Sequence, residues 1–170
     1  MSEEIRIYVA DLAAYNNGKL HGTWIDATQD IDDIWQQVKA MLASSPEEFA
    51  EEYAIHDYEG FYTKHISEYD SVESVHELAC FIDEHGEVGA ELLAHFCSVE
   101  EAQTAMEESY AGCYESLADY AEELTEGATQ IPEHLACYID YDKMGRDMEL
   151  GGDIFTIETG YREVHIFWNH

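Results

Sequence analysis

The sequence predicts an α+β fold of three small domains, in which α/β ends flank a helical, acidic middle. Three observations predict it. Residues 1–62 begin with strand-like alternation and continue with helical spacing of apolar residues, residues 63–105 have helical spacing throughout, and residues 106–170 end in two strand-like runs. No long Pro/Gly/Ser linker separates them, so we expect the three units to pack end to end.

The N-terminal α/β domain, residues 1–62, is predicted to be a hairpin covered by a helix. Apolar residues alternate from 5 to 10, Asn17-Gly18 offers a turn, and a second apolar run covers 20–25. Helical spacing from 31 to 42 follows Asp30, which is a suitable N-cap. This pattern places one amphipathic helix on the hairpin.

Two further segments complete this domain. Ser45, Pro46 and Glu48 combine a capping serine, a proline at the first helical position and a capping-box glutamate, which predicts a short acidic helix. Residues 53–62 are rich in aromatic side chains and contain Gly60, which favours a strand or an extended loop. We therefore expect a boundary near residue 63.

The middle domain, residues 63–105, is predicted to contain three helices. Apolar residues share one face from 72 to 82 before Gly86, and a second set covers 88–96. Ser98 and Glu101 form a capping box for a third helix that continues through Met106.

The C-terminal α/β domain, residues 106–170, is predicted to contain two helices and a hairpin. Helical spacing resumes from 117 to 124 and ends at Gly127, and a short helix begins at Pro132. The strand-like runs 154–157 and 161–167 flank a turn at Gly160.

The net charge restricts the partners. The chain has 38 Asp and Glu against 7 Lys and Arg, which gives a formal charge of -31 on 170 residues. Because 46% of the residues are hydrophobic and 12% are aromatic, the chain should fold instead of behaving as an acidic disordered tail. Such a charge repels nucleic acids and anionic membranes, so we expect a cationic partner.

Location and redox state are also predicted. No run of about 18 apolar residues is present, and the acidic N-terminus does not resemble a signal peptide, so we expect a cytoplasmic protein. Cys80, Cys97, Cys113 and Cys137 are widely spaced and form no CxxC pair, so we expect buried, reduced thiols.

The middle of the chain concentrates the negative charge. No Lys or Arg occurs between Lys64 and Lys143, and residues 65–142 hold 20 carboxylates. Helix positions four apart are separated by about 6 Å along the axis, and B-DNA phosphates advance about 3.4 Å per step. Carboxylates on successive helices can therefore match phosphate-like spacing. We call the following phosphate-mimicking candidates the acidic band: Glu68, Asp70, Glu73, Glu77, Asp83, Glu84, Glu87, Glu91, Glu100, Glu101, Glu107, Glu108, Glu115, Asp119, Glu122, Glu123 and Glu126.

Like charges three or four positions apart destabilise a helix when no cation lies nearby. Their accumulation in one region indicates a partner that supplies the positive charge. A salt-adapted protein is also acidic and poor in lysine, but solubility would be served equally by carboxylates spread over the whole surface. The uneven distribution therefore favours a binding role.

Motifs for catalysis or metal binding are incomplete. His76-Glu77 begins like HExxH, but Cys80 occupies the position of the second histidine, and His134 with Cys137 has no matching second pair. No phosphate-binding loop and no GxSxG motif is present.

A calcium loop is similarly incomplete. Asp140, Asp142 and Gly145 imitate its start, but Met144 takes position five and Gly151 takes the place of the bidentate glutamate. We predict no catalytic residue, no metal site and no cofactor.

Four segments together resemble one family. EEYAIHDYEGF (51–61), MEESYAGCYESLADYAEEL (106–124) and IPEHLACYIDYDKMGRDMELGGDIF (131–155) are similar to ArdA antirestriction proteins, as is the opening IYVADLAAYNNGKLHGTWID (7–26). The resemblance covers nearly the whole chain, and the order of the segments makes it specific.

This resemblance implies an elongated homodimer of three-domain subunits that mimics bent B-form DNA. The family occupies the DNA site of type I restriction-modification enzymes and is carried on mobile genetic elements. The antirestriction motif matches Leu135 to Asp147, and the subunit contact is implied in the C-terminal domain. The tail from His165 to His170 departs from the family. The candidate motif and dimer residues are Leu135, Tyr138, Ile139, Asp140, Tyr141, Gly145, Arg146 and Asp147.

Three hypotheses remain at this point. The first is a DNA mimic that binds the methyltransferase core of a type I enzyme and blocks restriction, and also modification if both activities use that core. The second is an acidic chaperone or sequestering protein for a basic nucleoid protein. The third is a salt-adapted enzyme.

Overall fold

The computed structural model describes residues 4–169 and divides into two compact units, residues 1–99 and 100–170. Each unit contains helices and a three-stranded antiparallel sheet, so the predicted α+β class is confirmed. The expected division into three domains is not confirmed. We refer to the N-terminal unit and the C-terminal unit below.

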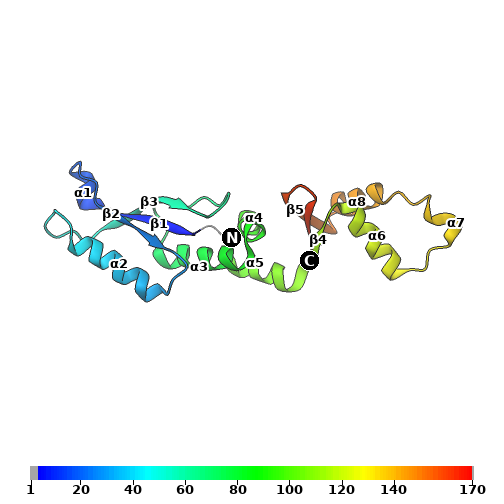
Figure 1. The fold of residues 1–170 in the computed structure, drawn as a ribbon, viewed down its shortest axis with the longest axis horizontal. Helices are drawn as coiled ribbons and strands as arrows, with labels where there is room; N and C mark the ends of the chain where they lie inside the picture. Colours follow the sequence, from blue (N-terminus) through cyan, green and yellow to red (C-terminus); the bar gives the residue numbers. More distant parts are fainter. Residues whose placement is uncertain (1–3, 170) are drawn as a thin grey trace. The chain divides into compact units, whose positions relative to one another are not determined.

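The sheet of the N-terminal unit has the order β2-β1-β3. Its strands are β1 (Arg6–Asp11), β2 (Gly22–Asp26) and β3 (Tyr53–Glu59), and β1 pairs antiparallel with both neighbours (Figure 1). The predicted pairing of the first two strands is confirmed. Their connection is longer than a simple turn, because the short helix α1 (Leu12–Asn16) precedes Asn17-Gly18.

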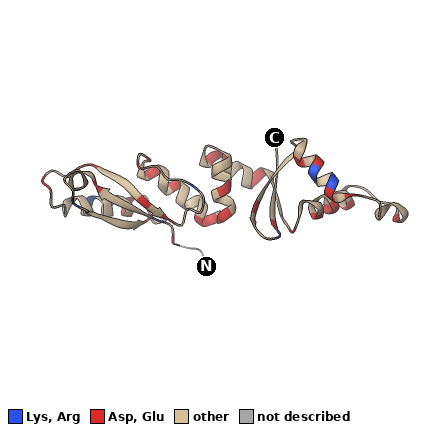
Figure 2. Ribbon diagram, turned by 90° about the horizontal axis from the view of Figure 1, so that it is seen from above, with Lys and Arg blue, Asp and Glu red and all other residues tan. Residues whose placement is uncertain are grey.

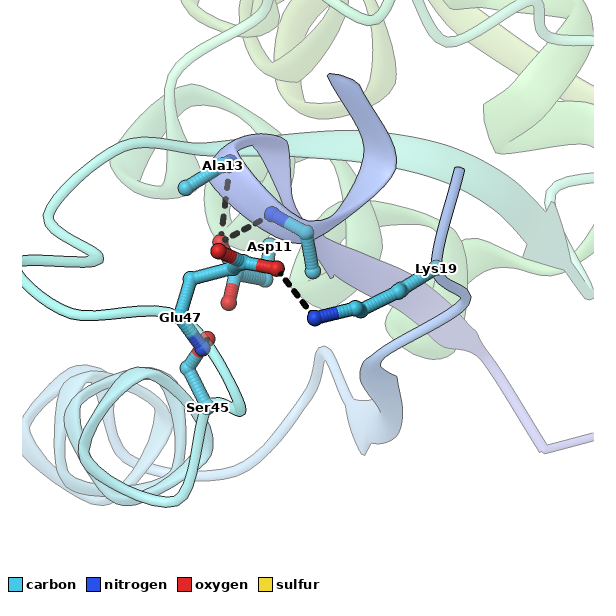
Figure 3. Close-up of polar contacts among 6 residues, drawn as sticks. Asp11, Ala13, Lys19, Ser45 and Glu47 are labelled. Carbon is cyan, nitrogen blue, oxygen red and sulfur yellow. Dashed lines mark hydrogen bonds and ion pairs between the residues drawn. The ribbon is translucent and has the colours of Figure 1, made fainter. Parts of the chain in front are cut away.

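A buried carboxylate starts α1. Asp11 Oδ1 accepts hydrogen bonds from the backbone N–H groups of Ala13 and Ala14 at 3.0 and 3.3 Å (Figure 3). Burial opposes ionisation, but the Ser45 hydroxyl and these two N–H groups outweigh it and lower the pKa of Asp11. The ion pair between Lys19 Nζ and Glu47 Oε1, at 2.7 Å, lies beside this cap.

Helix α2 (Ile31–Ala43) begins as predicted, since Asp30 accepts a hydrogen bond from Asp32 N at 2.9 Å. The helix packs against β1 and β2, and its buried residues include Ile34 and Val38. The short acidic helix expected at residues 45–48 is wrong, because this segment forms bends and a turn. Ser45 Oγ accepts from Glu47 N at 3.0 Å, which is a local turn bond in place of a helix cap.

The remaining helices of the N-terminal unit follow the predicted pattern. Helix α3 (Val72–His85) starts at Ser71, whose side chain accepts from Ser74 N. Gly86, at φ 69°, ends it, and α4 (Glu87–His95) follows directly. His76 Nδ1 lies 2.9 Å from the carbonyl oxygen of Ala27 and so attaches α3 to the end of β2.

The C-terminal unit contains five helical segments and three strands among its described residues. The helical segments are α5 (Val99–Thr104, which begins one residue before the unit), the π-helix η1 (Ala105–Ser109), α6 (Leu117–Ala128), α7 (Glu133–Ala136) and α8 (Tyr141–Leu150). The strands β4 (Tyr110–Tyr114), β5 (Ile154–Gly160) and β6 (Glu163–Trp168) form a sheet of order β4-β6-β5. The predicted hairpin of β5 and β6 is confirmed, whereas β4 and α8 were not predicted.

The core of this unit lies between the sheet and α6. Tyr120 packs with Ile154, Val164 and Ile166, and Trp168 packs against this cluster. Helix α8 contacts α6 where Gly145 meets Leu117, because a Cβ built on Gly145 would lie 2.8 Å from Leu117 Cγ. The glycine therefore permits a close approach of the two helices.

The expectation of buried cysteines is wrong at three positions. Cys97, Cys113 and Cys137 are exposed, Cys80 is half-buried, and all four are free thiols. Among residues 4–169, no helix is both long enough and apolar enough to cross a membrane.

Candidate functional site

The seventeen carboxylates of the acidic band are all described by the structure, and none of them is buried. Eight lie in the N-terminal unit, from Glu68 to Glu91, and nine lie in the C-terminal unit, from Glu100 to Glu126. Figure 2 shows the acidic positions along the helices of both units. The fold therefore places the band on exposed or half-buried positions within each unit.

Helix α6 carries the densest row. Asp119, Glu122, Glu123 and Glu126 occur at helical spacing on its exposed side, while Tyr120 and Ala121 are buried. The row runs over eight residues, which are seven helical steps, or about 10 Å along the axis. Repulsion within the row costs stability, and the packing of the opposite side against the sheet offsets it.

Helix α3 has a similar division. Glu73, Glu77 and Glu84 are exposed, and Val75 and Ala79 are buried. The apolar face is what forms the helix, since it packs into the core, whereas the carboxylates on the other face contribute no core contact. Apart from the hydrogen bond that Glu73 accepts from Trp35 Nε1 of α2, the fold of the unit does not explain their presence.

Several band carboxylates are held by uncharged donors. Glu73 accepts from Trp35 Nε1 at 3.2 Å, Glu91 from Thr63 Oγ1 at 2.7 Å and Glu107 from Gln103 Nε2 at 2.7 Å. Asp70 accepts from the backbone N–H of Ser67 at 2.8 Å. These bonds orient the carboxylates but leave their negative charge in place.

Cationic neighbours are few in comparison with the band. Arg162 lies 3.9 Å from Glu115, and His85 lies 3.7 Å from Glu84. Arg6 and Lys19 pair with Glu59 and Glu47, which are both outside the band. Since the whole chain has 7 Lys and Arg, internal pairing cannot neutralise seventeen carboxylates.

The negative charge of the band contributes to raised pKa values of two nearby tyrosines. A hydrogen bond to Glu123, together with burial and the charge of Glu123, raises the pKa of Tyr114 to about 12. Burial and the charges of Glu126 and Glu122 raise the pKa of Tyr141. Both phenols border α6, where a negative potential opposes formation of a second anion.

The predicted motif from Leu135 to Asp147 covers α7 and the first part of α8. Leu135 and Tyr138 are 47% and 81% exposed and lie three positions apart. Helix α7 has no buried residue. The start of the motif therefore presents apolar surface that the subunit itself does not cover.

The second half of the motif is mainly structural. Asp140 caps α8 by accepting from Lys143 N at 3.0 Å, and Gly145 makes the contact with α6 described above. Arg146 and Asp147 are exposed. A groove of about 480 Å³ runs beside this helix, and its lining residues are Ile139, Asp140, Lys143, Met144, Asp147, Met148 and Asp153.

Sequence reasoning missed two acidic residues next to the band. Glu149 and Glu158 line a second groove, of about 350 Å³, together with Glu115 and Arg162. They fall after Lys143 in the chain, so a search for a cation-free stretch excluded them. The strand-like alternation around Glu158 was the signal that could have placed its side chain on the outer face of the hairpin.

The incomplete metal motifs have other roles or none. Cys80 Sγ lies 3.7 Å from His76 Nδ1 and 3.9 Å from the carbonyl oxygen of Thr28, so this pair packs α3 against the loop after β2. Burial, followed by the charges of Asp83 and Asp26, raises the pKa of the Cys80 thiol. Within the described part of the chain, no group of three or more His, Cys, Asp or Glu is positioned to hold a metal ion.

Comparison with known proteins gives one family. The model of the family described as Antirestriction protein (ArdA) matches residues 7–163. No curated protein gives a match. The matched range includes the sheet of the N-terminal unit from residue 7 onward, strands β4 and β5 of the second sheet, the entire acidic band and the motif from Leu135 to Asp147, whereas β6 lies beyond it except for Glu163.

Proposed function

We propose that this chain, which belongs to the ArdA family of antirestriction proteins, is a DNA mimic that inhibits type I restriction-modification enzymes. The acidic band would occupy the DNA-binding groove of the methyltransferase core, with carboxylates meeting the Lys and Arg side chains that otherwise hold phosphates. Restriction is then blocked by competition for the groove, and modification is blocked wherever it uses the same groove. No catalytic step by this chain is needed.

One observation carries this proposal. All seventeen band carboxylates are at least partly exposed in a chain with 7 Lys and Arg. Most of their charge is therefore not neutralised within the chain and is accessible to a cationic partner. A DNA-binding groove is a protein surface with the complementary charge, because phosphate contacts from Lys and Arg dominate affinity for DNA. Affinity would arise from many modest contacts.

The proposal includes a homodimer that forms through the C-terminal unit. Its support is the uncovered apolar surface of Leu135 and Tyr138 inside the matched region. The site of action is the cytoplasm, where restriction enzymes meet incoming DNA. We expect neither nucleic acid nor membranes to bind the chain itself, because both are anionic.

The test is displacement of a labelled DNA duplex from a purified type I methyltransferase core by the full-length protein. We expect displacement that is competitive with DNA and weaker at higher salt. A parallel titration uses a basic nucleoid protein in place of the methyltransferase. Binding of the nucleoid protein without displacement from the methyltransferase would overturn the proposal in favour of an acidic chaperone.

A further inference from the structure

The N-terminal unit contains an aromatic pocket that shares one residue, Glu68, with the acidic band. It has a volume of about 570 Å³ and lies between α1, β3 and the loop that precedes α3. Buried Ile55 and Ile66 give it an apolar lining, and exposed Glu68 adds one carboxylate. Its ring-bearing residues are Tyr15, His56, Tyr58, His65 and Tyr69.

A β-bulge shapes one wall of the pocket. The pairing of β3 with β1 includes Ile55 and Asp57 but skips His56, which is the extra residue. The partners of Ile55 and Tyr58 are two residues apart on β1, so both side chains lie on one face although three positions separate them. Bulges commonly redirect side chains beside functional sites.

Contacts within the unit hold the rings in place. Tyr58 packs edge-on against buried Phe61, at 5.9 Å between ring centroids, and its hydroxyl lies 3.0 Å from His65 Nδ1. Tyr15 packs edge-on against His56 at 4.7 Å. The Asp11 cap (Figure 3) holds α1 in place. Helix α1 carries Tyr15. The pocket is therefore largely formed before any ligand binds.

The loop on the other side is also ordered by its own bonds. Ser67 N donates to Asp70 Oδ2 at 2.8 Å, and Tyr69 N donates to Ser67 Oγ at 3.2 Å. A hydrogen bond to Glu68 raises the pKa of the Tyr69 phenol, so the carboxylate and this ring are neighbours. The turn thus presents an aromatic ring and an anion together.

This combination selects for a planar cation. The faces of tyrosine rings attract cations within about 6 Å, and a guanidinium group stacks on a ring while it bonds a carboxylate. The net charge of -31 opposes any anionic ligand. Arg and Tyr are also the residues that most often dominate the binding energy of protein interfaces.

We propose that this pocket binds the guanidinium group of an arginine side chain from the basic partner. The proposal rests on the proposed function for the origin of that arginine, whereas the pocket chemistry can be tested without the enzyme. The arginine stacks on the tyrosine rings and pairs with Glu68. It serves as an anchor of fixed position within an interface of otherwise distributed charge contacts.

The experiment titrates the ¹⁵N-labelled full-length protein with the blocked tripeptide acetyl-Gly-Arg-Gly-amide and with its citrulline analogue, which has the same shape without the charge. We expect the arginine peptide to shift the signals of His56, Tyr58 and Ser67 in a saturable way, and the citrulline peptide to bind at least about tenfold more weakly. Tyr69→Leu and Glu68→Gln should each weaken arginine binding about three- to tenfold.

Matched controls distinguish the pocket from general attraction by an acidic surface. Tyr161→Leu removes a comparably exposed tyrosine (86%, against 88% for Tyr69), and Glu48→Gln removes an exposed carboxylate outside the pocket. Both should bind the peptide as the wild type does. The proposed pocket would be refuted if the control variants lost as much affinity for the arginine peptide as the pocket variants did. It would also be refuted if the peptide shifted the signals of α6 residues as strongly as those of the pocket.

The DNA-displacement assay separates this inference from the proposed function. If the wild-type protein displaces DNA but Tyr69→Leu does not weaken peptide binding, the proposed arginine pocket is refuted and the proposed function is retained. If the peptide binds in the pocket but the wild-type protein does not displace DNA, the proposed function is refuted and the arginine pocket is retained.

Discussion

Substitutions on the exposed face of α6 can remove negative charge from the acidic band while they leave the shape of the protein almost unchanged. The variant carries Asp119→Asn with Glu122, Glu123 and Glu126 changed to Gln, which removes four negative charges and almost no volume. All four side chains are exposed, so no core contact is lost. Any loss of inhibition then reports on charge.

The expected loss of affinity follows from the value of exposed ion pairs. Each contact contributes about 0.2–1 kcal/mol, so four contribute about 0.8–4 kcal/mol, or roughly a 4- to 700-fold weaker complex. The loss should be gradual when the substitutions are introduced one at a time. It should also shrink as salt increases, because salt screens exposed charges.

Stability should change in the opposite sense or hardly at all. The row contains four like-charge pairs at i,i+3 or i,i+4, and removing each adds about 0.2–0.5 kcal/mol. Loss of the Asp119 charge near the start of the helix and of the Glu123 bond to Tyr114 subtracts a similar amount. We expect the free energy of unfolding to stay within about 1 kcal/mol of the wild type.

The assay is competition with a DNA duplex for the methyltransferase core at two salt concentrations, with urea unfolding of each variant alongside. The control changes Glu4, Glu48, Glu51 and Glu52 to Gln, which alters the net charge equally at exposed positions outside the band. This control should inhibit nearly as well as the wild type. Equal losses in both variants, or complete loss from a single α6 substitution, would refute the reasoning.

Three further outcomes are expected. Tyr138→Asp should give monomers in sedimentation at micromolar concentration, because it places a charge in the uncovered apolar surface; a persistent dimer would place the interface elsewhere. Gly145→Ala should lower the midpoint of urea unfolding by the equivalent of about 1–3 kcal/mol, since its Cβ would meet Leu117, and an unchanged midpoint would contradict this packing. Glu123→Gln should lower the pKa of Tyr114 from about 12 toward its ordinary value of 10.0, measured by the absorbance of the ionised phenol. Because the folded-state pKa is raised, the stabilising effect of this phenol is complete below about pH 10 and is lost as pH rises toward 12, and the variant should lose less stability over that range.

Elements with a continuous apolar face were predictable. Helix α2 has both a capping aspartate and apolar residues at regular spacing, and its predicted limits agree with the structure. The helix expected after Ser45 had a good start signal but nothing to bury, and Phe49 in that segment is 89% exposed. A short helix without packing is marginal in water, so a turn forms there.

Short elements in the C-terminal unit escaped prediction for a different reason. Strand β4 has five residues, follows a π-helix directly and contains Gly112 at φ 128°. Gly145 was considered as a position in a calcium loop and as a member of the motif from Leu135 to Asp147, whereas in the structure it lets α8 approach α6. Contacts between distant segments decide both features.

The candidate site was likewise predictable from the sequence only in part. The exposure of the acidic band was predictable, because a carboxylate with neither a cation nor several hydrogen-bond donors, such as those that hold Asp11, has no stable place in a core. The aromatic pocket was not, since Tyr15, Tyr58 and Tyr69 come from three separate segments and the bulge at His56 breaks the strand alternation. No local periodicity brings these rings together.

The bare helix α7 has a consequence for handling the protein. The stretch between Lys64 and Lys143 lacks Lys and Arg, so trypsin has no cleavage site there, whereas a protease that cuts after aromatic residues and leucine finds Leu135 and Tyr138 exposed. Segments without buried side chains open locally at little cost in free energy. Cleavage at Leu135 and Tyr138 should therefore decrease when another surface covers them, so limited proteolysis reports whether the segment around α7 is bound.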